Sequence, residues 1–172
     1  RQPAVIPANA YGYAIRYSSF EDAKLLAAIL KAGLKVRFSE REFTIGTNKF
    51  SRGTMIVLKK GNEDKISALQ QAALQFNGAV TPIETGFMDA GFDFGSGKIH
   101  FIKTPRVAMI TGRGTYSTSS GEMWHFFDQL LDYPVTLINA EDLPNVSLKN
   151  IDVLVIPGGN YRFLSDKDAS AG

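Results

Sequence analysis

A chain of 172 residues without cysteine holds no disulfide, no thiolate zinc site and no thiol nucleophile. Its 19 basic and 17 acidic residues are interspersed and give a net charge of +2, which indicates no basic surface for nucleic acid. Its apolar runs are strand-sized, too short for a membrane span. The length suits one ordinary domain or two small ones.

The first half of the chain predicts strands and helices in alternation. An extended segment is expected over residues 1–10 and a strand over 11–17, after which Ser19 and Asp22 fit the capping box of a helix that Gly33 ends. Three further strand signals, one irregular segment and one helix signal follow. They predict a strand over 34–38, a short hairpin or an irregular loop over 40–52 around residues 46–48, a strand over 53–58, a helix over 63–76 and a strand over 79–83.

Residues 85–103 carry four glycines between aromatic side chains (TGFMDAGFDFGSGKIHFIK). Glycine at such a density favours turns. We therefore expect this segment to cross between two subdomains, with a strand over residues 98–102. The expected domains are an N-terminal α/β unit over 1–103, which includes this crossover, and a second α/β unit over 104–172.

The second half begins with a buried strand over residues 106–111, a glycine-rich and hydroxyl-rich loop over 112–118, and a helix over 120–131. Ser119 and Glu122 fit the capping box S-x-x-E. The helix carries an apolar stripe that predicts a core-facing side, formed by Trp124, Phe127, Leu130 and Leu131. A strand over 135–138, a polar connection over 142–150 and a strand over 152–156 follow. Because both halves share this layout, we expect an α/β fold of two small open sheets, both mainly parallel.

Two turns at strand ends form the candidate binding crevice. The carboxyl ends of parallel strands hold ligands in many α/β proteins, and glycine turns there expose backbone N–H groups. The candidate residues are Gly112, Gly114, Ser119, Ser120 and Glu122 in the first turn and Pro157, Gly158, Gly159 and Asn160 in the second. Two roles remain open for them: binding of an anion or small ligand, or a purely structural turn and cap.

No catalytic residue and no metal site are assigned. The second glycine turn could form an oxyanion hole, but no nucleophile elbow G-x-S-x-G follows it. His125 and Asp128 lie three residues apart on one helix, and two ligands do not make a metal site.

The second half of the chain resembles the region downstream of the peptidase domain in large bacterial zinc carboxypeptidase-like proteins. The resemblance is carried by GFDFGSGKIHFIKTP, by PRVAMITGRGTYSTSSGEMWHFFDQLLDYPVTLIN and by DVLVIPGGNYRFL, with G-E-x-W and P-G-G-N-Y as the most specific pieces. It covers residues 85–164 best. It implies that the second unit is flavodoxin-like and is the incomplete start of a class I glutamine amidotransferase-like domain.

The resemblance also implies a function. The chain would be a non-catalytic accessory region of a secreted or periplasmic metallopeptidase, with a packing, regulatory or ligand-binding role. Its partners would be the peptidase domain of the same polypeptide and a peptide or glycan, and zinc would be held only in that peptidase domain. Neither His100 nor His125 is followed by glutamate three residues on, so the peptidase motif itself is missing here.

An alternative function belongs to another class. The chain would then be a fragment of an active class I glutamine amidotransferase-like hydrolase whose nucleophile lies beyond residue 172. Because the chain starts at Arg1 and shows no signal peptide, we expect it to be part of a longer polypeptide that carries any targeting signal elsewhere.

Overall fold

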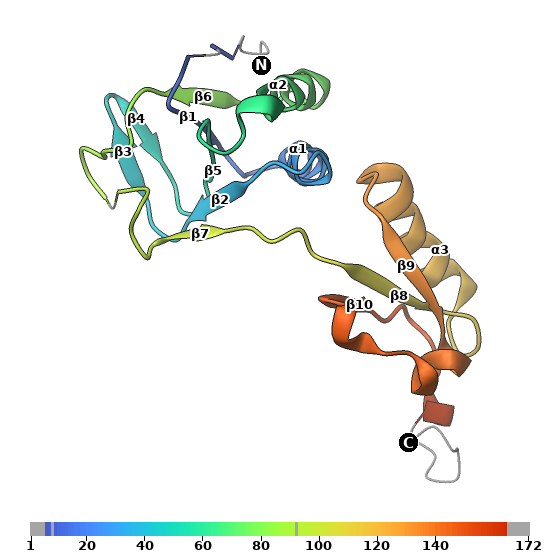
Figure 1. Ribbon diagram of the computed structural model, residues 1–172. Coiled ribbons are helices and arrows are strands. Elements are labelled where there is room, and N and C mark those ends of the chain that lie inside the picture. The colour runs from blue at the N-terminus through green and yellow to red at the C-terminus, as the bar shows by residue number, and fades with distance from the viewer. Residues whose placement is uncertain (1–5, 8, 92, 165–172) are drawn as a thin grey trace. The chain divides into compact units, whose positions relative to one another are not determined.

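The computed structural model of the protein describes residues 6–7, 9–91 and 93–164 (Figure 1). Most of the extended segment expected over residues 1–10 lies outside these ranges. The chain divides into two compact units, Arg1–Thr104 and Pro105–Gly172. Within the described ranges, no helix combines the length and the apolarity that crossing a bilayer requires.

The described residues of unit 1 form two α-helices and seven short strands. Its first helix begins where the sequence predicts, because the N–H of Asp22 donates to Ser19 Oγ (3.3 Å) and Asp22 Oδ2 accepts the N–H of Ser19 (2.9 Å). In chain order the elements are β1 Gly12–Ile15, α1 Phe20–Lys31, β2 Val36–Ser39, β3 Phe43–Ile45, β4 Asn48–Phe50, β5 Met55–Leu58, the 3₁₀ turn Glu63–Lys65, α2 Ile66–Gln75, β6 Val80–Ile83 and β7 Ile99–Phe101.

The main sheet of unit 1 is antiparallel, so the mainly parallel sheet expected there is wrong. Its strand order is β6-β1-β5-β2-β7, and each neighbouring pair is antiparallel. The crossover through α1 does make β1 and β2 run in the same direction, as expected of a strand–helix–strand unit. However, β5 lies between them, and β1 likewise lies between β5 and β6. The result is two interlocked split β-α-β units, a ferredoxin-like arrangement.

The two faces of this sheet are covered differently (Figure 1). Helices α1 and α2 pack on one face, where Leu25, Ile29 and Leu69 meet strand side chains such as Tyr13 and Val57. The β3–β4 hairpin and the chain after β6 cover part of the other face. That second core contains Ala14, Phe43, Phe50, Ile56, Ile83 and Phe94.

The glycine-rich segment precedes the division between the two units at Thr104 and Pro105. It stays on unit 1, where Phe94 is buried and Thr44 exchanges hydrogen bonds with the backbone of Asp89 and Ala90. The segment ends in β7, which pairs with β2. Phe94 therefore anchors this segment on the sheet.

Unit 2 is built on a three-stranded parallel sheet, as expected for this half. The strand order is β10-β8-β9, with β8 in the centre. The elements are β8 Val107–Thr111, α3 Ser117–His125, a π-helical turn Phe126–Leu130, β9 Val135–Asn139, 3₁₀ turns Ala140–Asn145 and Leu148–Asn150, β10 Val153–Val155 and the 3₁₀ turn Arg162–Leu164.

Helix α3 differs from its prediction in two respects. It begins at Ser117 after Tyr116, so the capping box predicted for Ser119 and Glu122 is wrong. The predicted core-facing stripe is also partly wrong, since Trp124 is 41% and Leu130 40% exposed. The chain changes from an α-helix to a wider π-helical turn after His125, which shifts the angular positions of Phe127 and Leu130 relative to Trp124.

Candidate functional site

The two predicted glycine turns meet at the carboxyl end of the unit 2 sheet. Thr115 and Gly159 form an antiparallel bridge, in which the N–H of Tyr116 donates to the Gly158 carbonyl (2.8 Å) and the N–H of Asn160 donates to the Gly114 carbonyl (2.7 Å). Strands β9 and β10 flank β8 on opposite sides, so the connections that leave the carboxyl ends of these strands run in opposite directions. Crevices in open α/β sheets usually form at such a point. The sequence therefore located two segments that the fold brings together.

Glycine is required in these turns for steric reasons. Gly112 and Gly114 have φ of 81° and 87°, in the left-handed region that side chains disfavour. A Cβ atom on Gly112 would lie 2.5 Å from Asn139 Oδ1, and one on Gly159 would overlap the carbonyl oxygen of Gly114. The close approach of the two turns thus depends on Gly114 and Gly159, whereas Gly112 allows the first turn to pack against Asn139.

Ser119 links the helix to the second turn. Its Oγ accepts the Gly158 N–H at 2.8 Å, so one of the donors expected to be free for a ligand is already used. The adjoining residue Pro157 is buried, and its carbonyl accepts the Tyr161 hydroxyl at 2.8 Å. Burial raises the pKa of Tyr161, which keeps that hydroxyl protonated as a donor.

Ser120 and Glu122 do not join the glycine turns. Ser120 Oγ donates to the Tyr116 carbonyl (3.1 Å), and the residue lines a separate pocket of about 310 Å³ between α3 and strands β8 and β9. Trp124 and Leu137 make this pocket largely apolar. Glu122 lies on the exposed side of α3. The structure therefore separates the predicted crevice into a closed pair of turns and an apolar pocket beside the helix.

Sequence reasoning missed three polar neighbours of the crevice. Arg113 forms an ion pair with Glu141 (3.6 Å), its guanidinium lies 5.0 Å from the Phe163 ring centroid, and Asn139 abuts Gly112. One signal could have located two of them: Asn139 is the last residue of β9, Glu141 follows shortly after it, and the ends of parallel strands share one sheet edge. With Arg113 paired, the crevice carries little unbalanced charge.

Metal-ligating residues do not gather at this edge. Across residues 6–7, 9–91 and 93–164, no three His, Asp or Glu side chains lie close enough to hold a metal ion. His125 ends α3, and Asp128 falls in the π-helical turn that follows.

Comparisons with protein-family models, curated proteins and solved structures find no match to this chain.

Proposed function

We propose that this chain is a non-catalytic accessory region of a secreted or periplasmic zinc carboxypeptidase-like protein. Unit 2 would be the flavodoxin-like start of a class I glutamine amidotransferase-like domain whose glycine turns have a structural role. The chain would pack against the peptidase domain of the same polypeptide and orient it, or it would bind a peptide or glycan. Zinc would be bound by the peptidase domain alone.

One observation supports the structural role best. The backbone donors of an oxyanion hole must point at empty space that a substrate oxygen can enter. In the second turn, the N–H of Gly158 instead donates to Ser119 Oγ, and the N–H of Asn160 donates to the Gly114 carbonyl. Two of the three candidate donors are thus satisfied by the protein itself, which suits a turn that holds the unit together.

The alternative function also has an observation in its favour. The N–H of Gly159 donates no hydrogen bond to the residues that the structure describes, which leaves one possible oxyanion donor. The parallel strand order β10-β8-β9, with a glycine turn after β10, is compatible with an amidotransferase-like hydrolase. In that case the nucleophile would have to come from outside this chain.

A glycine variant in the full-length protein that contains this sequence separates the two functions. Gly159→Val should force the turns apart, because its Cβ would overlap the Gly114 carbonyl oxygen. Gly121→Ala is the matched control, since a Cβ there meets no atom within 4 Å. The accessory role predicts that Gly159→Val lowers the melting temperature and impairs peptide hydrolysis or peptide binding, while Gly121→Ala changes neither.

Two results would contradict the accessory role. One is unchanged stability, hydrolysis and peptide binding in the Gly159→Val protein. The other is hydrolysis of glutamine by the wild-type protein that Gly159→Val abolishes and Gly121→Ala preserves, which would support the amidotransferase-like alternative.

A further inference from the structure

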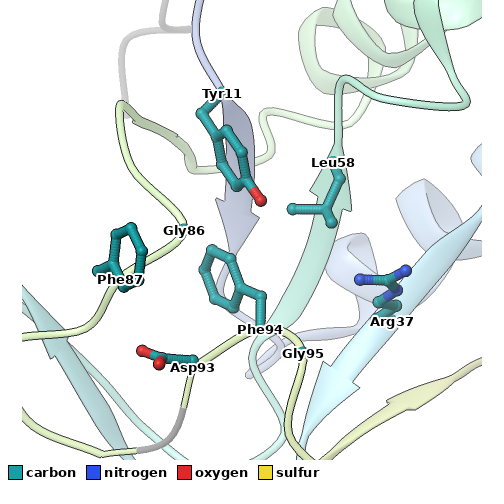
Figure 2. A pocket seen from close by; sticks show the side chains of 8 residues that line it. All are labelled: Tyr11, Arg37, Leu58, Gly86, Phe87, Asp93, Phe94 and Gly95. Atoms are coloured by element: carbon teal, nitrogen blue, oxygen red, sulfur yellow. The ribbon is translucent and has the colours of Figure 1, made fainter.

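Unit 1 carries a pocket that the function proposed above does not use. It has a volume of about 330 Å³ and opens on the sheet face opposite the two helices (Figure 2). The side chains that line it come from the start of β1, from β2 and β5, and from the glycine-rich segment. Those used below are Tyr11, Arg37, Leu58, Phe87, Asp93 and Phe94.

The apolar part of this pocket offers flat surfaces. Phe94 is buried and forms part of the second core, whereas Phe87 is 76% and Tyr11 44% exposed. The rings of Tyr11 and Phe94 are nearly parallel, at 10°, with their centroids 6.4 Å apart. Gly86 allows Tyr11 to lie against the backbone, since a Cβ there would be 2.7 Å from the Tyr11 hydroxyl. Exposed aromatic rings beside a buried one favour a ligand that itself contains a flat apolar group.

The cationic part is the guanidinium group of Arg37. Its Cζ lies 4.4 Å from the centroid of the Phe101 ring, which holds the group by a cation–π contact. Among the residues that the structure describes, Arg37 has no carboxylate partner within ion-pair distance. The guanidinium group carries five N–H donors, and those that the cation–π contact leaves free suit a carboxylate.

The polar groups of the pocket are few and separated. In Figure 2, Asp93 and Arg37 lie on opposite sides of the Phe94 ring. One oxygen of Asp93 accepts the Met88 N–H at 3.3 Å, so its other oxygen can accept from a ligand. A glycan needs hydrogen-bonding partners along its whole length, which this mainly apolar lining does not provide.

We propose that this pocket binds an aromatic carboxylate, with the ring against Tyr11 and Phe87 and the carboxylate on Arg37. Two sources share this chemistry: the C-terminal aromatic residue of a peptide, and a free aromatic amino acid. The proposal concerns unit 1 alone and is independent of the role proposed for unit 2.

The test is an NMR titration of the ¹⁵N-labelled 172-residue chain with N-acetyl-phenylalanine. A ligand of this size in an open pocket should bind with a dissociation constant of about 1 mM. N-acetyl-phenylalanine amide, which lacks the carboxylate, and N-acetyl-leucine, which lacks the ring, should each bind at least tenfold more weakly. A parallel titration with free phenylalanine distinguishes the two sources of ligand. Tighter binding of N-acetyl-phenylalanine than of phenylalanine indicates the C-terminus of a peptide, whereas tighter binding of phenylalanine indicates the free amino acid.

Three variants complete the experiment. Arg37→Met should weaken binding at least tenfold, whereas Arg52→Met, which removes an exposed arginine elsewhere in unit 1, should leave it unchanged. Phe87→Ala alters a side chain that is largely in solvent, so it should weaken binding several-fold without affecting the fold. The proposal is overturned if no saturable shifts occur, if the amide binds as well as the acid, or if neither Arg37→Met nor Phe87→Ala weakens binding.

Discussion

Asn62 provides the sharpest stability prediction, because one buried amide joins two strands of unit 1. The side chain is 1% exposed. Its Oδ1 accepts the N–H of Lys35 at 2.7 Å, and its Nδ2 donates to the carbonyls of Leu58 (2.8 Å) and Lys35 (3.1 Å). Asn62 thereby ties the start of β2 to the end of β5, next to the helix that leads away from it.

Asn62→Ala should destabilise unit 1 by about 3 kcal/mol. Each of the three hydrogen bonds contributes roughly 1 kcal/mol net, and the backbone groups left behind are partly shielded from water. For a unit of this size, a loss of about 3 kcal/mol corresponds to a decrease in melting temperature of roughly 12–24 °C. It would also remove a large share of a total stability that is typically about 5–15 kcal/mol.

The assay is urea unfolding followed by circular dichroism, together with amide hydrogen exchange in β2 and β5. Gln71→Ala is the control, because it removes an exposed amide side chain from α2 and should change stability by less than about 0.5 kcal/mol. Exchange in β2 and β5 should rise only in the Asn62 variant. A loss below about 1 kcal/mol with unchanged exchange would refute the reasoning.

Three further predictions follow from other contacts. Asp22→Ala should cost about 1–2 kcal/mol by removing the capping box of α1, which a lower melting temperature would report and an unchanged one would contradict. The pKa of Glu40 is lowered, first by its hydrogen bond to the neighbouring histidine and then by the adjacent lysine, so its stabilising contribution is present above the ordinary pKa of 4.5 and is lost as the pH falls through the lower folded value. Glu40→Gln should therefore reduce the fall in stability between neutral and acidic pH, and an identical acid unfolding curve would count against this ion pair. Gly112→Ala should destabilise unit 2 by at least about 1–2 kcal/mol, since it combines a left-handed backbone with a clash at Asn139, and an unaltered unfolding midpoint would show that the turn relaxes freely.

Local signals made the elements predictable. Helix α1 illustrates this, because Ser19, Asp22 and Gly33 act within a few residues of the backbone groups that they satisfy. The β3–β4 hairpin likewise follows from alternating apolar residues around Gly46, which has a φ of 57°. Such interactions need no knowledge of the rest of the chain.

Strand partners were not predictable in the same way. The sequence around β1, α1 and β2 is that of an ordinary strand–helix–strand unit, and nothing local reveals that β5 inserts between the two strands. The same limit applied to the glycine-rich segment, whose place on unit 1 depends on the distant partners of Phe94 and of β7. The pocket at Arg37 was missed for this reason, since its lining residues are brought together only by that topology.

The candidate crevice was predictable because parallel strands follow a positional rule. Both glycine turns come directly after strands, and the carboxyl ends of parallel strands lie at the same edge of a sheet. Predicting a parallel sheet was therefore enough to predict that the two turns lie close together. The details were not accessible. Ser119 was interpreted as a helix cap, whereas the helix starts earlier and the hydroxyl reaches Gly158 instead.

The interlocked strands of unit 1 also determine when its sheet can form. Strands β1 and β2 do not pair with each other, because each of them pairs with β5, for example through Tyr13 and Val57. Both strands therefore lack their shared partner until the chain has been synthesised through β5. In unit 2 the central strand β8 comes first and its neighbours are added outward. Because closing long loops slows folding, unit 1 should be the slower unit to fold. Two fragments of unit 1, cut in the turn before β5, should each lack the five-stranded sheet and form it only when mixed.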